Sequence, residues 1–226
     1  TLLSSRVDGI LISVAKLTRD FEHFRKIIDN RIPLVFFDRI CDEIETDRVI
    51  VDDEAGAYEA VKHLINIGCR NIIHLSGPPD VNIGRNRKNG YIKALREFNL
   101  PVFEENIVNC DTSDDAILVV PRLLSRKEKP DGIFAVNDLT AAQAMKIVKQ
   151  RGYRVPEDIS IIGFTSGMIS DLTDPSLTSV AQHGYVIGEE AVKLLIGRIE
   201  RKKEMPFQTK IIRTELVIKD STRRAI

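Results

Sequence analysis

The sequence predicts an α/β fold in which helices cover parallel sheets, and three observations support this class. Short apolar segments typical of strands alternate with amphipathic helical patterns along almost the whole chain. Several of these strands end on a polar residue, as in Ile10-Leu11-Ile12-Ser13. The 226 residues, 43% of them hydrophobic, are enough to bury the core of one large domain or two small ones.

Strands are expected where apolar runs are bounded by proline, glycine or polar turns. Pro33 prevents the helix before it from continuing, and the turn Ser76-Gly77-Pro78-Pro79 closes a later strand. The last segment is expected to form a single strand with a Thr-Glu interruption. The predicted strands comprise residues 9–13, 34–38, 49–51, 71–75, 106–110, 133–136, 159–164, 178–181 and 211–218.

Helices are expected where apolar residues recur every three or four positions. Thr18, Asp53 and Asp138 are placed to cap three of them, because a short polar side chain there accepts a hydrogen bond from the first turn. Gly68 and Gly152 follow two of these same helices as stop signals. The predicted helices comprise residues 19–30, 54–67, 85–98, 114–125, 139–151 and 184–200.

The composition excludes several functional classes. Lysine plus arginine and aspartate plus glutamate both number 33, so the excess basic charge of a nucleic-acid-binding module is missing. The three cysteines form no C-x-x-C pair and the four histidines show no metal-ligand spacing, which argues against a disulfide framework or a metal site and favours a reducing compartment. No apolar run approaches the roughly 20 residues of a membrane span. No signal peptide is visible, although Thr1 is not a natural start, so the true N-terminus is expected to be missing.

The run Pro130-Asp131-Gly132-Ile133-Phe134-Ala135-Val136-Asn137-Asp138 is the strongest functional signal. A turn leads into a buried strand, which stops on two small polar residues before a helix begins. In an open α/β sheet, ligands bind just beyond the carboxyl ends of the strands. Because Asn137 offers both a donor and an acceptor there, this pattern and its repeats predict a cleft for a polar small molecule.

Nine segments in a fixed order resemble the effector-binding domain of lac-repressor-type transcription regulators, which share their fold with periplasmic sugar-binding proteins. Each segment alone is a weak signal, but the ordered set is specific and spans nearly the whole chain. The segments are Val7 to Ser13, Ile32 to Arg39, Val51-Asp52-Asp53 before Gly56-Ala57, His63-Leu64-Ile65 before Gly68-Cys69-Arg70, Leu75 to Pro78, Arg87 before Gly90-Tyr91, Pro130 to Asp138, Gly152 to Gly163, and Pro175 to Val180.

The resemblance implies two parallel-sheet α/β subdomains joined by three crossovers, with an effector in the cleft between them. The N-terminal subdomain would comprise residues 1–51 and 183–206, and the C-terminal one residues 52–182 and 207–226. Family members carry a helix-turn-helix head and two strand–helix units before the position of Thr1, so the first subdomain would be truncated. The implied protein is a cytoplasmic homodimer that binds operator DNA only through that head, and the helices around residues 54–67 and 80–98 are candidate dimer surfaces.

The resemblance also implies which residues contact the effector. The arginine matching Arg87 reaches into the cleft in family members, where a guanidinium suits hydroxyl or carboxylate ligands. Arg87 is expected at the start of its helix, and Asp138 is expected to cap the next helix rather than to contact the ligand. The candidate effector-binding residues are Ser13, Asp38, Arg39, Asp52, Arg87, Asn137, Phe164, Thr165 and Ser166.

Thr165 departs from the family pattern. Many relatives have an aspartate directly after Gly-Phe or Gly-Tyr, and that carboxylate accepts hydrogen bonds from sugar hydroxyls. A neutral hydroxyl neither requires donors nor repels anions, so a phosphorylated or acidic sugar becomes an alternative to a neutral sugar.

Two other functions compete with the sensing domain of a repressor. A periplasmic solute-binding protein of a sugar transport system would share the fold and differ by carrying a signal peptide. An enzyme is disfavoured because the chain contains no G-x-G-x-x-G, P-loop, nucleophile elbow or H-E-x-x-H motif. No catalytic residue and no cofactor are expected.

Overall fold

The computed structural model describes residues 7–200 and 206–222, and it confirms the predicted α/β class with parallel sheets. The chain divides into two compact units and passes from one to the other three times. Unit 1 comprises Thr1–Asp52 and His183–Arg213, and unit 2 comprises Asp53–Gln182 and Thr214–Ile226. Each unit has its own sheet and its own core.

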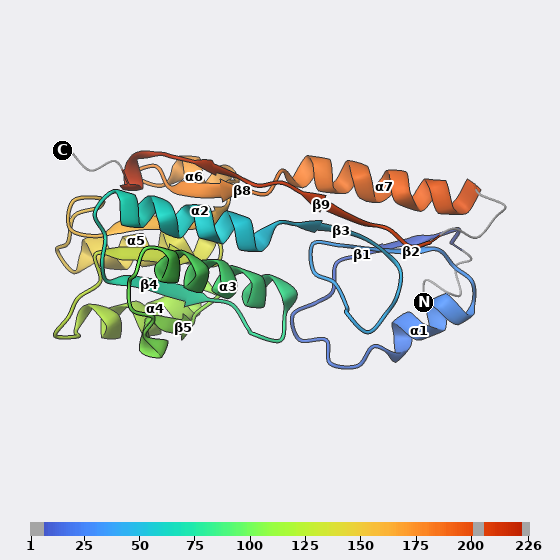
Figure 1. Ribbon diagram of the computed structural model, residues 1–226, viewed down its shortest axis with the longest axis horizontal. Helices are drawn as coiled ribbons and strands as arrows, with labels where there is room; N and C mark the ends of the chain where they lie inside the picture. Colours follow the sequence, from blue (N-terminus) through green and yellow to red (C-terminus); the bar gives the residue numbers. More distant parts are fainter. Residues whose placement is uncertain (1–6, 201–205, 223–226) are drawn as a thin grey trace. The chain divides into compact units, whose positions relative to one another are not determined.

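Unit 1 contains a four-stranded sheet in the order β1-β2-β3-β9, and all of its pairings are parallel (Figure 1). Neighbouring residues of each strand face opposite sides of the sheet, so the apolar runs bury both faces. Ile10 and Phe36 pack with α1 on one face, whereas Leu11 and Val35 pack with α7 on the other. The elements are β1 (Ile10–Ile12), α1 (Glu22–Asp29), β2 (Leu34–Phe37), β3 (Asp47–Val51), α7 (Gly184–Glu200) and β9 (Thr209–Ile212).

Unit 2 contains a six-stranded sheet in the order β10-β8-β7-β6-β4-β5, in which only the edge strand β10 is antiparallel. Helices α2 and α3 cover one face of the sheet, and α4 and α5 cover the other. The elements are α2 (Asp53–Asn66), β4 (Ile72–Ser76), α3 (Asn82–Glu97), β5 (Ile107–Asn109), α4 (Ser113–Leu124), β6 (Gly132–Ala135), α5 (Asp138–Gln150), β7 (Ser160–Thr165), α6 (Met168–Leu172), β8 (Thr178–Ala181) and β10 (Glu215–Val217), with single 3₁₀ turns at Glu104–Asn106 and Asp220–Thr222.

The segment 211–218 differs most from the prediction. It does not form one strand: β9 pairs with β3 in unit 1, and β10 pairs with β8 in unit 2. The break between the two strands is at Arg213 and Thr214, one residue before the expected Thr-Glu interruption, and it is there that the chain leaves unit 1, after Arg213 rather than at residue 206. The short helix α6 also differs, because it occupies a segment expected to be a loop.

Three helix starts differ from the predicted caps. Helix α1 begins at Glu22, after Phe21 rather than Thr18. Helix α5 is capped by Asn137, whose side-chain oxygen accepts a hydrogen bond from the Thr140 N–H at 2.8 Å. Asp53 and Asp138 are the first helical residues of α2 and α5, and their carboxylates contact distant segments of the chain instead.

Candidate functional site

In unit 1 the candidate residues lie at the carboxyl ends of three adjacent parallel strands. Ser13 follows β1, Asp38 follows β2 and Asp52 follows β3. Because the order β1-β2-β3 places these ends at one edge of the sheet, the topology brings the three side chains to the same side of unit 1. Asp38 has a left-handed backbone, with φ at 61°, and its N–H donates to the Val49 carbonyl at 3.0 Å.

The loops at this edge are tied together. The Val14 N–H donates to the Arg39 carbonyl at 2.9 Å, and the Arg39 Nε–H donates to the Val14 carbonyl at 2.6 Å. Beside them, the Ser13 hydroxyl oxygen is buried and has no hydrogen-bond partner within residues 7–200 and 206–222. A buried hydroxyl without a partner is costly, so this edge has a polar group that a ligand or water would satisfy.

In unit 2 the candidate residues also lie at the carboxyl ends of adjacent parallel strands. Asn137 lies just beyond the end of β6, Thr165 ends β7, and Ser166 follows it. The Asn137 side chain caps α5 and donates from its amide to the Asp111 carbonyl at 2.8 Å. Thr165 is exposed and has a φ of 145°, and Ser166 follows at 55°, so two residues with side chains hold strained backbone at this edge.

Arg87 is the most constrained side chain of the candidate set. Helix α3 begins at Asn82 rather than near residue 85, so Arg87 lies in its second turn and faces the sheet. Its Nε–H donates to the Asp53 carboxylate at 2.8 Å, and its Nη2 lies 2.7 Å from the same oxygen. Its Nη1 donates to the Val136 carbonyl, and the guanidinium lies over the Phe164 ring at 3.5 Å. These contacts join α2, α3, β7 and the residue that directly follows β6 at one point.

The Arg87–Asp53 pair is buried, and it leaves part of the guanidinium's hydrogen-bonding capacity unused. The Arg87 and Asp53 side chains are only 4% and 2% exposed. A guanidinium has five N–H donors, and the contacts to Asp53 and Val136 use three of them. Two N–H donors of Arg87 are therefore left for which the described part of the chain supplies no acceptor. A hydroxyl or carbonyl oxygen of a small ligand would supply one.

Asp138 anchors the strained segment after β7. Its carboxylate accepts hydrogen bonds from the Ser179 hydroxyl at 2.5 Å and from the Gly167 N–H at 3.2 Å. The Ser179 hydroxyl in turn accepts from the Ser166 N–H at 2.9 Å. Burial raises the pKa of Asp138, and these hydrogen bonds oppose that shift. Asp138 thus links the start of α5 to Gly167 and, through Ser179, to Ser166.

Sequence reasoning missed the roles of Asp53 and Asp138. Both follow strands and begin helices, so capping is the local explanation for each carboxylate. Their partners Arg87 and Ser179 are 34 and 41 residues away in the sequence, and no local pattern indicates such pairs. The sequence offers one signal for the ion pair: Asp53 and Arg87 have opposite charges and belong to two helices expected to cover the same sheet.

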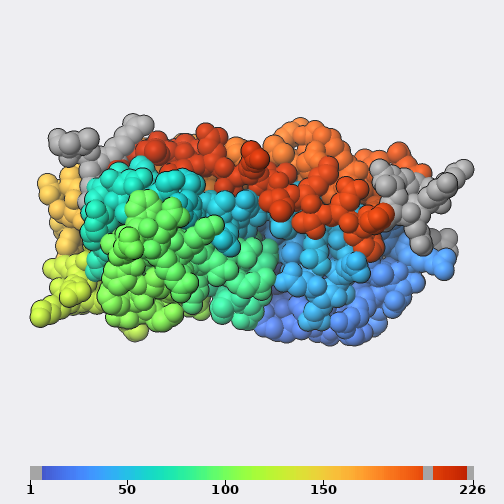
Figure 2. Space-filling view, viewed as in Figure 1, coloured from blue at the N-terminus to red at the C-terminus, as the bar shows by residue number. Residues whose placement is uncertain are grey.

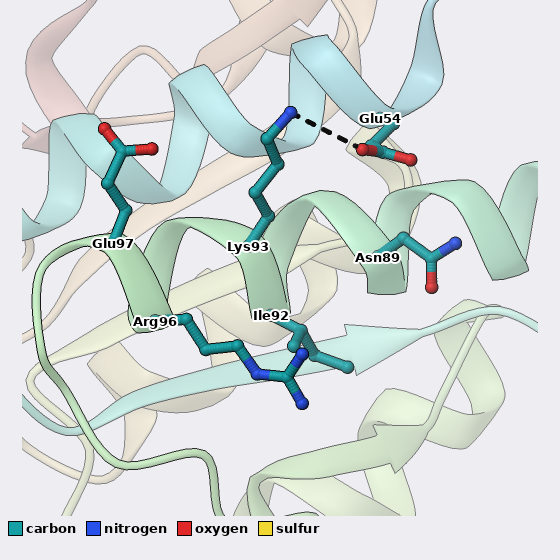
Figure 3. Close-up of a pocket in the computed structure, with 6 residues that line it drawn as sticks. All are labelled: Glu54, Asn89, Ile92, Lys93, Arg96 and Glu97. Carbon is teal, nitrogen blue, oxygen red and sulfur yellow. Dashed lines mark ion pairs between the residues drawn. The ribbon is translucent and has the colours of Figure 1, made fainter.

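A hollow lies elsewhere in unit 2, on the outer sides of α2 and α3, which form a continuous surface in Figure 2. It measures about 620 Å³ and contains none of the candidate effector residues. Figure 3 shows Lys93 of α3 reaching toward Glu54 of α2, at 3.7 Å. Both side chains are largely exposed, so the hollow is open and charged rather than an enclosed binding pocket. Its lining residues are Glu54, Asn89, Ile92, Lys93, Arg96 and Glu97.

Comparison with known proteins decides the family. Residues 61–222 match the family model of the periplasmic binding protein-like domain. The chain belongs to this family. Within it, the resemblance to lac-repressor-type regulators is confirmed by the relatives: the HTH-type transcriptional regulator DegA of Bacillus subtilis (strain 168) is 32% identical over 222 residues. That alignment covers 98% of the chain and 66% of DegA, so this periplasmic binding protein-like domain spans about two thirds of the regulator's length.

Solved structures agree with the domain's fold throughout the chain. The transcriptional regulator CelR in complex with cellobiose has a TM-score of 0.89 and 29% identity, and the match covers 97% of this chain and 67% of that one. A LacI-family regulator from Enterococcus faecium with bound ribose has a TM-score of 0.85 and 25% identity, covering 98% and 81%. The domain's relatives are thus transcription regulators, two of them solved with sugars.

Two further findings concern the described residues only. None of the helices in residues 7–200 and 206–222 is long and apolar enough to cross a membrane. Across the same ranges, no three histidine, cysteine, aspartate or glutamate side chains cluster closely enough to hold a metal ion.

Proposed function

We propose that this chain is the effector-sensing region of a transcription repressor and that it binds a small sugar-like molecule. The observation that carries the proposal is Arg87, a buried guanidinium with two N–H donors left to satisfy, fixed beside Asn137, Thr165 and Ser166 at one edge of the unit 2 sheet. The buried Ser13 hydroxyl at the corresponding edge of unit 1 supports it. Sugars present the hydroxyl groups that such donors and acceptors bind.

A sugar or a sugar phosphate both fit this donor set. The solved relatives bound to cellobiose and ribose support a neutral sugar. The relatives' identity as regulators favours this function over a transport-associated solute-binding protein and over an enzyme. By the same reasoning the protein acts in the cytoplasm, and operator DNA is bound by a helix-turn-helix head rather than by this chain.

A calorimetric titration tests the proposal directly. The 226-residue chain is titrated with a panel of mono- and disaccharides, including ribose and cellobiose, together with ribose 5-phosphate. We expect at least one member to bind, and Arg87→Lys to weaken it at least tenfold, because lysine keeps the charge but cannot reproduce the planar fork. Binding that Arg87→Lys leaves unchanged would exclude this residue from the site.

We further propose that the protein forms a homodimer through α5 and α6 of unit 2. Helix α6 lies along α5: the Gly167 N–H donates to the Asp138 carboxylate at one end, and Lys149 donates to the Asp174 carbonyl at 2.7 Å at the other. Together the two helices expose Leu139 by 53%, Met168 by 77% and Leu172 by 75%. Clustered exposed apolar side chains mark an interaction surface.

The α5–α6 surface suits a second copy of the chain better than the hollow on α2 and α3 does. Interface cores are poor in charged residues, whereas that hollow is lined mainly by charged side chains. A smaller hollow of about 350 Å³ lies at the far end of the α5–α6 surface. It is of mixed character, lined by Ala142, Met145, Lys146, Lys149, Gln150, Thr173 and Asp174. The charged α2–α3 surface, which the sequence suggested as the dimer interface, is the alternative, and mutation of exposed residues distinguishes the two interfaces.

A further inference from the structure

We infer that Asp53 determines the charge of the ligand that Arg87 accepts. By neutralising the guanidinium, Asp53 makes this part of the site select an uncharged, hydroxyl-bearing group over an anionic one. This rests on the proposed function, because it concerns the same site and adds a specificity-determining residue to it.

The geometry of the pair leaves no net charge at this point of the site. A single oxygen of Asp53 lies 2.8 Å from Nε and 2.7 Å from Nη2 of Arg87, and both side chains are nearly fully buried. A ligand that approaches the two remaining N–H groups therefore meets donors without a compensating positive charge. A hydroxyl oxygen loses little on desolvation there, whereas a phosphate or carboxylate loses its hydration without gaining an opposite charge.

The helix ends at this edge already carry negative charge. The N-terminus of a helix ordinarily attracts anions, because its first N–H groups and its dipole are positive. Helix α2 begins with Asp53 and α5 begins with Asp138, so a carboxylate is present at each of these positive ends. Neither helix end is thereby free to compensate a bound anion.

The neighbouring cations are engaged by other groups. Lys88 follows Arg87 on α3, and its amine lies 3.5 Å from the Glu104 carboxylate. Lys219, which acts electrostatically on Asp138, lies 2.7 Å from the Asp171 carboxylate and donates to the Ser170 hydroxyl. Neither lysine therefore changes the charge balance at Arg87.

The ion pair also changes what Thr165 implies about the charge of the ligand. The absence of an aspartate at that position suggests an anionic ligand, because one negative charge is lost. In the structure, Asp53 supplies a carboxylate to the same sheet edge from α2, so the loss at Thr165 does not leave Arg87 with an unbalanced positive charge.

Nuclear magnetic resonance of the Arg87 Nε–H group tests this assignment on the chain as it exists. Inorganic phosphate is the anionic probe, and glucose with glucuronate is a matched neutral and anionic pair. In the wild type we expect phosphate and glucuronate to leave the Arg87 signal unchanged up to millimolar concentrations. In Asp53→Asn, which keeps the shape but removes the charge, we expect phosphate to shift the signal and the glucuronate-to-glucose affinity ratio to rise at least tenfold.

Glu54→Gln is the matched control, because it removes the same charge one residue further along α2, where the carboxylate faces the exposed Lys93. It should leave the Arg87 signal and the affinity ratio at the wild-type values. A wild-type Arg87 signal that responds to phosphate would overturn the inference. Because this titration uses only the wild-type chain, it tests the inference even if Asp53→Asn does not fold. An Asp53→Asn variant with unchanged selectivity would overturn it as well. If phosphate acts only on Asp53→Asn but no sugar binds the wild type, the charge assignment stands and the proposed function fails instead.

Discussion

Breaking the Arg87–Asp53 pair should cost unit 2 much of its stability, and the structure allows the size of the effect to be worked out. Arg87→Met removes three N–H contacts and leaves the Asp53 carboxylate, only 2% exposed, without its cation. Removing one partner of a buried ion pair costs about 3–5 kcal/mol, and the lost contact with the Phe164 ring adds roughly 1–2 kcal/mol. The whole free energy of unfolding of a typical domain is only about 5–15 kcal/mol, so this loss would be a large part of it.

A double-mutant cycle separates this pair from the packing around it. Asp53→Asn alone leaves the guanidinium buried without a counter-charge, so it should also be strongly destabilising. In the double variant, Asp53→Asn with Arg87→Met, no uncompensated charge is buried. We therefore expect the double variant to be more stable than the sum of the two single effects predicts, by at least about 2 kcal/mol.

Native-state hydrogen exchange of the α2 and α3 amides is the suitable assay, because it reports the opening of unit 2 independently of unit 1. Lys93→Met, which breaks the exposed pair with Glu54, is the control and should cost less than about 1 kcal/mol. The ion-pair explanation is refuted if Arg87→Met costs no more than this control, or if the single effects simply add.

Three other parts of the structure carry predictions of their own. Burial lowers the pKa of His74 from 6.5 to about 4, because the imidazolium loses its hydration there and its Nε2 has no partner in the described residues; the hydrogen bond between Nδ1 and the Phe134 carbonyl opposes this shift only in part. Between these pH values the unfolded chain binds a proton at His74 that the folded chain does not. The free energy of unfolding should therefore fall by up to about 3 kcal/mol from pH 6.5 to pH 4. In urea titrations at several pH values, His74→Phe should remove this part of the pH dependence of the free energy of unfolding. Met168→Glu should convert the dimer to a monomer in sedimentation experiments, whereas Leu118→Glu, at a position 63% exposed on α4, should not; dimers that persist in Met168→Glu would rule out the α5–α6 surface. The isolated chain, with no net charge, should show no sequence-dependent binding of duplex DNA in a shift assay at physiological salt, and submicromolar binding would contradict that.

The sequence alone determined the class and order of the elements, because these follow from local patterns. The 3.6-residue recurrence of apolar side chains places α7 at Gly184–Glu200, and the short polar-bounded run places β8 at Thr178–Ala181, both at the predicted bounds. The carboxyl ends of the strands also follow from the sequence, since each apolar run stops on a polar residue such as Ser13, Asp38 or Asn137. Local patterns are therefore sufficient to locate a candidate edge for ligand binding.

Only the tertiary structure decided what each polar residue at that edge does. Asp53 and Asp138 begin helices, and a cap satisfies the local pattern equally well, so their partners on distant segments have no signature in the sequence. The division of residues 211–218 between two sheets likewise depends on which strand offers unpaired backbone groups, which is a property of the assembled fold. Contacts of this kind are set by long-range packing and by the cost of burying charge, and neither can be read from a local run of residues.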